Sequence, residues 1–125
     1  MATLLVIEDE APLRANIVRI LAAEGYRVLA AADGDEGIRR AREERPDLVI
    51  CDILMPRLDG YGVLALLRSQ PETAGIPFIF LTASADKDDF ARGLQSGAND
   101  YVTKPFRIAD LLAAVRRGLP PGGGQ

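Results

Sequence analysis

Short apolar runs alternate along the chain with longer segments in which apolar residues recur every three or four positions. A short, continuous run rich in valine, isoleucine and leucine is typical of a strand buried in a parallel sheet. Four such runs cover residues 4–7, 27–30, 48–51 and 77–81, and residues 100–103, which follow Ser96 and Gly97, are expected to form a last strand. Recurrence at three and four residues is typical of a helix that packs on a sheet with one face. The pattern therefore predicts five strands, each followed by a helix.

The expected helices have their own start and stop signals. Pro12 suits the first turn of the first helix, and Gly25 suits its end. Asp33 with Glu36 resembles a capping box, and Asp86 is placed to cap the fourth helix. The apolar stripes of the five helices are Leu13, Ile17, Ile20 and Leu21; Ile38 and Ala41; Val63, Leu64 and Leu67; Phe90 and Leu94; and Ile108, Leu111, Leu112 and Val115.

Strands joined by helices through such short connections lie parallel, with right-handed crossovers and helices on both faces of the sheet. We expect an α/β fold of the flavodoxin-like, doubly wound type, with five parallel strands in the order 2-1-3-4-5. Residues 1–118 would form this single domain. Residues 119–125 have little to bury and are rich in proline and glycine, so we expect a flexible tail or the start of a linker.

The amino-acid composition excludes several kinds of catalytic and metal-binding site. The 125 residues contain no histidine and a single cysteine, Cys51. Histidine-based acid–base catalysis, Ser-His-Asp triads and histidine zinc sites are therefore excluded within this chain. Cys51 lies inside an apolar run and is expected to be a core residue. The net charge of −3 offers no general attraction for nucleic acid, and the arginines within residues 39–45 lie among glutamates, as on a solvated helix face.

The sequence also bears on location. Residues 1–10 lack the basic segment and long apolar run of a signal peptide. No apolar run approaches the ~20 residues that a membrane-spanning helix needs. We therefore expect a cytoplasmic protein that does not bind the membrane.

Polar side chains stand where four of the predicted strands end. Glu8 and Asp9 follow the first strand, Asp52 the third, Thr82 the fourth and Lys104 the fifth. Because the carboxyl ends of parallel strands share one edge of a sheet, we expect these residues to be neighbours. Two carboxylates 4 Å apart repel by about 4 kcal/mol at an effective dielectric near 20, so the cluster needs protons or a cation. Oxygen donors without histidine or thiolate favour Mg²⁺.

A cation at this edge would allow phosphoryl chemistry. Asp52 would act as a carboxylate nucleophile toward a phosphoryl group and become an aspartyl phosphate. Mg²⁺ and the Lys104 ammonium would stabilise the charge of the transferring group, and the Thr82 hydroxyl would hydrogen-bond one of its oxygens. Taken singly, Thr82 and Lys104 are ordinary strand-end and surface residues. Their joint placement at strand ends is what favours a functional site.

Four motifs follow one another along the chain: VIEDE at residues 6–10, VICDILMPRLDG at 49–60, FLTASA at 80–85 and GANDYVTKPF at 97–106. In this order and combination the chain resembles the receiver domain of two-component response regulators, from Thr3 to about Gly118. The resemblance implies that Asp52 accepts phosphate from a sensor histidine kinase or a phosphotransfer protein. It also implies a phosphoacceptor signalling domain that assists only its own phosphorylation and dephosphorylation, not an enzyme.

The resemblance assigns the metal ligands. Asp9, Asp52 and the backbone carbonyl of Leu54 would bind Mg²⁺ directly. Glu8 would act through a metal-bound water, with an extra methylene relative to the aspartate that many family members carry there.

The resemblance also assigns a switch. Thr82 would move toward the phosphate while the Tyr101 ring turns inward. This movement would reshape the face made by the fourth helix, the strand over residues 100–103 and the last helix, and the face would bind a downstream protein or a second copy of the chain. An aromatic at Tyr101 that simply packs in the core or at the sheet edge, without switching, is the alternative.

Two further expectations concern the turn before the last helix. The resemblance implies a cis peptide bond between Lys104 and Pro105. Arg107 departs from the family, since a receiver commonly has a serine, aspartate or asparagine helix cap there. We therefore expect the last helix to fray at its start.

Three other functions are weighed against this one. An Asp-nucleophile phosphatase of the haloacid dehalogenase type usually carries a second aspartate two residues after the nucleophile, where this chain has Leu54. A flavodoxin-like cofactor carrier would need a hydroxyl- and glycine-rich phosphate loop after the first strand, where Glu8, Asp9 and Glu10 stand. A phosphorylation-independent interaction module with the same fold would tolerate loss of the acids or the lysine, and this chain retains both.

Overall fold

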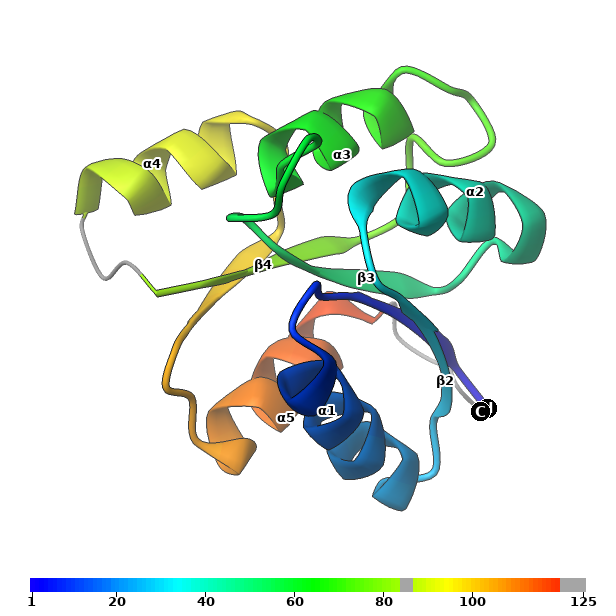
Figure 1. Ribbon diagram of the computed structural model, residues 1–125, viewed down its shortest axis with the longest axis vertical. Helices are drawn as coiled ribbons and strands as arrows, with labels where there is room; N and C mark the ends of the chain where they lie inside the picture. The colour runs from blue at the N-terminus through cyan, green and yellow to red at the C-terminus, as the bar shows by residue number, and fades with distance from the viewer. Residues whose placement is uncertain (84–86, 120–125) are drawn as a thin grey trace.

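The computed structural model of the protein describes residues 1–83 and 87–119, with the backbone alone for residues 87–90. Its centre is a five-stranded sheet in the order β2-β1-β3-β4-β5, with every neighbouring pair parallel (Figure 1). The strands are β1 (Thr3–Ile7), β2 (Arg27–Ala31), β3 (Leu48–Asp52), β4 (Phe78–Thr82) and β5 (Asp100–Thr103). The predicted fold class and strand order are confirmed.

A helix follows each strand and forms the crossover to the next. The helices are α1 (Ala11–Ala23), α2 (Gly34–Glu44), α3 (Gly60–Arg68), α4 (Lys87–Gln95) and α5 (Ile108–Gly118). α2, α3 and α4 cover one face of the sheet, and α1 and α5 cover the other (Figure 1). The sheet is therefore buried on both sides, which explains why its strands are nearly continuous apolar runs.

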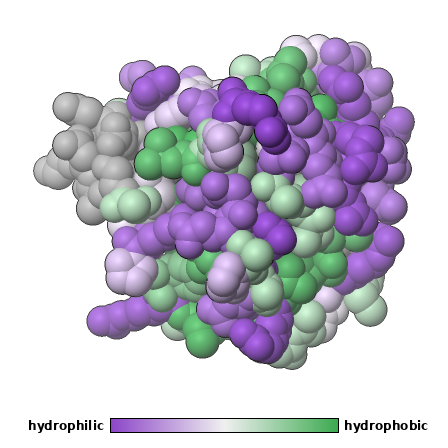
Figure 2. Space-filling model, in the orientation of Figure 1, coloured by the Kyte–Doolittle hydropathy of each residue, from purple (hydrophilic) through white to green (hydrophobic). Residues whose placement is uncertain are grey.

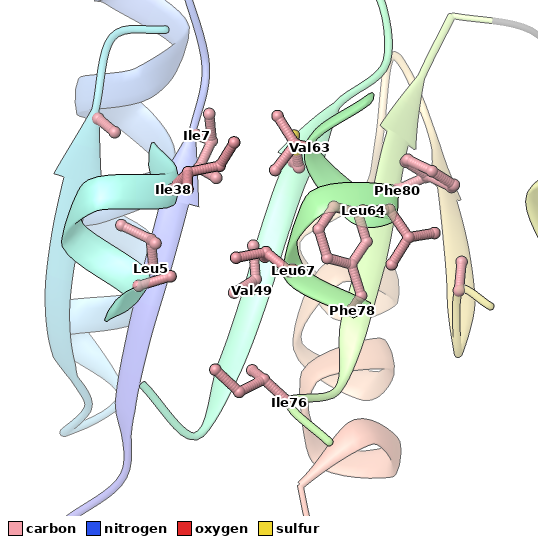
Figure 3. Close-up of a cluster of buried hydrophobic side chains, with 14 of the residues drawn as sticks. Leu5, Ile7, Ile38, Val49, Val63, Leu64, Leu67, Ile76, Phe78 and Phe80 are labelled. Carbon is pink, nitrogen blue, oxygen red and sulfur yellow. The ribbon is translucent and has the colours of Figure 1, made fainter. Parts of the chain in front are cut away.

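The core consists of two clusters of buried side chains, one on each face of the sheet. Successive strand residues point to opposite faces, so Leu5 and Ile7 join the cluster under α2 and α3, whereas Leu4 and Val6 join the cluster under α1 and α5. Figure 3 shows side chains of β1, β3 and β4 reaching toward those of α2 and α3. Cys51 is fully buried in the same cluster, as predicted.

The helix termini follow the predicted signals where the structure describes them. The Asp33 side chain accepts a hydrogen bond from the Glu36 amide at 2.8 Å, and the Glu36 side chain accepts one from the Ala32 amide at 2.6 Å. Gly25 follows α1 with φ at +93°, a left-handed conformation that favours glycine. The predicted cap Asp86 lies outside the described residues.

Two residues predicted in the apolar stripes are exposed instead. Ile108 is 56% exposed because it begins α5 beyond the carboxyl edge of the sheet, and the buried part of the helix starts at Leu111. Leu94 is 53% exposed, since α4 turns the buried Gly93 toward the sheet instead. The side chain of Phe90, the other apolar position predicted for α4, lies outside the described atoms.

The turn between β5 and α5 has both predicted local features. The Lys104–Pro105 peptide bond is cis. Arg107 occupies the N-cap position of α5 with an extended backbone and makes no side-chain hydrogen bond to the helix. The first turn of α5 therefore lacks the side-chain cap that α2 and α3 have.

The face of the molecule seen in the orientation of Figure 1 is largely polar. Figure 2 shows a largely hydrophilic face interrupted by separate hydrophobic patches. On α2, exposed Arg39 lies 3.7 Å from Glu36 and 3.6 Å from Glu43, as expected for a solvated helix face. Across the described ranges, no helix is long and apolar enough to cross a membrane.

Candidate functional site at the carboxyl edge of the sheet

Four strands end at one edge of the sheet and bring the predicted polar residues together. Asp52 and Thr82 are the last residues of β3 and β4. Glu8 directly follows β1, and Lys104 directly follows β5. Because Ile7 pairs with Cys51 across the two strands, Glu8 stands level with Asp52. Strand register thus places these side chains at the same height above the core.

Lys104 binds two of the acids. Its Nζ atom lies 3.0 Å from Asp52 Oδ2 and 3.1 Å from Glu8 Oε1. The side chains are 19% exposed for Lys104, 7% for Asp52 and 0% for Glu8. Charges this far out of water interact more strongly than surface pairs do, and losing one partner leaves the others uncompensated. Lys104 therefore secures the acids to one another from the neighbouring strand end.

Glu8, Asp9 and Asp52 form a carboxylate cluster. One oxygen from each lies within 4.8 Å of the others. Glu8 and Asp52 are buried, whereas Asp9 is exposed and opens the cluster to solvent. Hard oxygen donors, with one side open for water or phosphate oxygens, are the ligands that Mg²⁺ prefers. The residues present therefore fit a divalent cation of this kind.

The electrostatics of the cluster follow from burial and crowding. The pKa of Glu8 is raised from 4.5 to about 7, mainly because burial disfavours the charged carboxylate. The hydrogen bond from the Glu10 amide and the nearby Lys104 ammonium act to lower this pKa, and the charge of Asp52 acts to raise it. For Lys104, burial lowers the pKa, but the hydrogen bonds and charges of Asp52 and Glu8 outweigh it and leave the pKa raised. Lys104 thus remains a cation, while Glu8 holds a proton more readily than an exposed glutamate does.

A hollow of about 390 Å³ opens beside Thr82. Four of its lining residues come from different parts of the fold: Leu54 from the β3–α3 loop, Thr82 from the end of β4, Tyr61 from α3 and Arg92 from α4. Thr82 is 5% exposed, and Leu54, two residues beyond Asp52, is 75% exposed. Both the predicted hydroxyl and the predicted carbonyl-bearing residue therefore border this hollow.

Gly60 lets α3 begin directly against the backbone of Asp52. A side chain at Gly60 would place its first carbon 2.5 Å from the Asp52 carbonyl oxygen and 2.8 Å from the Ile53 Cα. The Gly60 amide donates a hydrogen bond to the Ile53 carbonyl at 2.8 Å, and Asp59 caps the helix by accepting from the Gly62 amide at 2.8 Å. The motif at residues 49–60 thus fixes the loop that carries Asp52.

Tyr101 lies on β5 and packs against the core under α3 and α4. Its ring centroid is 5.8 Å from that of Phe80, and its hydroxyl oxygen is 3.5 Å from that of Tyr61. The guanidinium carbon of Arg92 lies 4.1 Å from the Tyr61 ring centroid. Sequence reasoning pointed to Tyr101 but missed Tyr61 and Arg92, because nothing local to α3 or α4 indicates that these helices face each other at those positions.

Comparison with known proteins agrees with this geometry. The sequence model of the response regulator receiver domain family matches residues 4–116. The chain is 44% identical over 116 residues to the probable transcriptional regulator ycf27 of Porphyridium aerugineum. That alignment covers 93% of this chain but 47% of the relative, so the chain spans about half the length of the curated relatives it matches.

Solved structures agree as well. Chemotaxis protein CheY4 of Vibrio cholerae superposes with a TM-score of 0.90 at 31% identity, over 95% of this chain and 99% of that one. The receiver domain of the sensor histidine kinase PA1611 of Pseudomonas aeruginosa gives a TM-score of 0.86 at 37% identity, over 94% of this chain and 96% of that one, and has a magnesium ion coordinated in its active site cleft. By its fold, its strand-end residues and these similarities, the chain belongs to the response regulator receiver domain family of two-component signalling systems.

Proposed function

We propose that this receiver domain accepts a phosphoryl group on Asp52. The observation that carries the proposal is the environment of Asp52, which ends a buried strand 3.0 Å from the Lys104 ammonium and within 4.8 Å of two further carboxylates. Such a cluster contributes little to the stability of the fold, because neighbouring acids repel one another and buried ions lose their hydration. It suits a site that receives a cation and a charged group.

The phosphoryl group comes from a phosphohistidine on a sensor histidine kinase or a phosphotransfer protein. An Asp52 oxygen forms a bond to phosphorus as the phosphorus–nitrogen bond breaks, and the bonding electron pair leaves with the imidazole nitrogen. Lys104 balances the charge of the transferring group, and the Thr82 hydroxyl donates a hydrogen bond to one of its oxygens. The domain assists only the gain and hydrolysis of its own phosphate and does not act as an enzyme.

We assign the metal ligands to Asp9, Asp52 and the backbone carbonyl of Leu54, with Glu8 acting through a bound water. Mg²⁺ supplies positive charge that offsets the acids and the phosphoryl oxygens when it binds. The oxygen cluster and the magnesium ion in the similar PA1611 receiver domain support this assignment.

Phosphorylation then changes an interaction face. Thr82 responds to the phosphoryl group and Tyr101 responds to Thr82, which shifts the population of the surface formed by α4, β5 and α5. That surface binds a downstream protein or a second copy of the chain. Tyr101 supports this role by its position, because it lies on β5 and its ring packs against the core and against Gly93 of α4.

We assign the domain to residues 1–118, and the interpretation of residues 119–125 as a tail or the start of a linker stays a prediction from the sequence. α5 ends at Gly118, and residues 120–125 lie outside the described part of the chain. The domain would work in the cytoplasm without nucleic-acid or membrane contacts of its own. Its output would come from a partner protein or from a further domain.

Mass spectrometry tests the proposal directly. Incubation with Mg²⁺ and acetyl phosphate should add one phosphoryl group to the protein and none to Asp52→Asn. Asp47→Asn is the matched control, because Asp47 immediately precedes the strand that Asp52 ends and so lies at the opposite edge of the sheet. This control should be labelled like the unchanged protein.

The outcomes separate the candidate functions. Equal labelling of Asp52→Asn would reject Asp52 as the acceptor. A protein that takes no label at all would favour the phosphorylation-independent interaction module, and steady hydrolysis of a phosphomonoester over many turnovers would favour the phosphatase.

A further inference from the structure

Two aromatic rings, those of Phe80 and Tyr61, lie next to Tyr101 on the side of the sheet covered by α3 and α4. The Phe80 ring of β4 lies 5.8 Å from the Tyr101 ring and 5.0 Å from the Tyr61 ring of α3. The two tyrosine hydroxyl oxygens are 3.5 Å apart, so one can donate a hydrogen bond to the other. Tyr101 therefore contacts α3 through its hydroxyl group and β4 through an edge-type contact between its ring and the Phe80 ring.

The Tyr101 ring also packs closely against Gly93 of α4. A first side-chain carbon at Gly93 would lie 2.9 Å from both Cζ and the hydroxyl oxygen of Tyr101, and closer still to Cε2. These separations are shorter than real carbon contacts allow. Gly93 is buried within α4 and its backbone does not have a positive φ, so space for the ring, not backbone freedom, is what the glycine provides.

The residue before Gly93 makes a second contact between α4 and α3. The Arg92 guanidinium lies over the Tyr61 ring at 4.1 Å from its centroid, a cation–π arrangement. Helices α3 and α4 lie side by side over this face of the sheet (Figure 1). Two consecutive residues of α4 thus hold both tyrosines, Arg92 from above Tyr61 and Gly93 from beside Tyr101.

We propose that Gly93 and Tyr61 are positioning residues that form a seat for the inward ring of Tyr101. Gly93 supplies room for the ring, and Tyr61 supplies a hydroxyl partner for its tip. The functional consequence rests on the proposed function, in which the inward ring accompanies phosphorylation: a variant with a poorer seat has a smaller inward population and binds a phosphoryl mimic less tightly.

Gly93→Ala should displace the ring without unfolding the domain. The atoms that meet the new methyl group belong to the far end of the Tyr101 side chain, which can swing away about its own bonds. Alanine also favours a helix more than glycine does. The variant should therefore fold and keep Tyr101 in an outward position.

The seat is tested first without any phosphoryl mimic. The chain has three tyrosines, so ¹³C labelling at tyrosine Cε gives a small set of NMR signals, which single Tyr→Phe variants assign. Gly93→Ala should shift the Tyr101 signals strongly, and Tyr61→Phe should shift them less. Tyr26, packed on the opposite face of the sheet, should remain unchanged. Gly75→Ala, where nothing lies within 4 Å of the added carbon, is the control for the first variant, and Tyr26→Phe is the control for the second.

The second measurement is a beryllofluoride titration in Mg²⁺. Gly93→Ala should weaken the apparent affinity about fivefold or more, while the affinity for Mg²⁺ alone stays within error of the unchanged protein. Unshifted Tyr101 signals in Gly93→Ala, or an unchanged beryllofluoride affinity in that variant, would overturn the seat. If the unchanged protein itself bound no beryllofluoride, the proposed function would fail, and the NMR shifts would still decide whether Gly93 positions the ring.

Discussion

Lys104 binds Glu8 and Asp52 at 3.1 and 3.0 Å, while Asp9 adds a third carboxylate to the same cluster. One ammonium leaves net negative charge when all three acids are ionised. Either a proton on Glu8 or a divalent cation can remove part of this excess. The pKa of Glu8 is raised mainly because its carboxyl is buried, and the nearby charge of Asp52, which also makes the site suitable for Mg²⁺, adds to the rise.

Glu8 makes the metal-free stability depend on pH. Burial raises its pKa from 4.5 to about 7, so the folded state holds a proton that the unfolded state has already lost between these values. The contribution of Glu8 to stability is therefore largest at low pH and falls as the pH rises through this window. In EDTA, the melting temperature of Glu8→Gln should fall less than that of the unchanged protein as the pH rises from about 5 to about 8.

The difference in melting temperature between the two proteins is the quantity to follow. It should change steadily in favour of Glu8→Gln as the pH rises. If the difference in melting temperature stayed constant across this pH range, the carboxyl of Glu8 would have the same pKa in the folded and unfolded states. Glu24→Gln, at the exposed end of α1, provides a control for loss of a glutamate charge.

Among the elements, α5 begins with an unused capping position. Arg107 has the extended backbone of an N-cap residue, with φ −85° and ψ 144°, but makes no side-chain hydrogen bond to the helix. A serine hydroxyl there can accept from an amide of the first turn, which typically contributes about 1 kcal/mol. Arg107→Ser should therefore raise the melting temperature by about 4 °C for a chain of this length.

Arg107→Ala separates capping from charge. It removes the same guanidinium but supplies no acceptor, so it should leave the melting temperature below that of Arg107→Ser. Equal stability of the two variants would assign the gain to the lost arginine instead of a new cap.

Periodicity was enough to predict the elements, because each strand is buried on both faces and each helix follows one strand. It was not enough to orient α4 and α5 on the sheet. The repeat that suggested Leu94 leaves out Gly93, which is buried against the Tyr101 ring. Ile108 fits its helical stripe, but the sheet ends before it.

In the candidate site, the residues at strand ends could be predicted from the sequence, whereas the residues on helices could not. Asp52, Thr82 and Lys104 stand at strand ends, and parallel strands bring their ends together. Tyr61 and Arg92 stand on helices, whose rotation depends on packing between distant segments. Local sequence carries little information about such packing, so the contacts between α3 and α4 emerged only from the structure.

For the molecule as a whole, the site exists only when the chain is folded. The contacts of Lys104 join residues 96 positions apart in the case of Glu8 and 52 positions apart in the case of Asp52. The unfolded chain cannot hold these groups together. A cation that binds the cluster therefore binds the folded state almost alone and stabilises it by mass action.

Mg²⁺ should accordingly raise the melting temperature of the domain. At free Mg²⁺ about a hundred times its dissociation constant, the stabilisation is about 2.7 kcal/mol. For a domain of this size that corresponds to a rise of about 10 °C. Sodium chloride at equal ionic strength is the control for screening, and it should give a much smaller rise because it occupies no site.

Asp9→Asn should lose most of the Mg²⁺ effect, since it removes the exposed carboxylate of the cluster while leaving both Lys104 contacts in place. A rise as large in Asp9→Asn as in the unchanged protein would mean that the cation binds elsewhere, and the proposed ligand set would have to be abandoned.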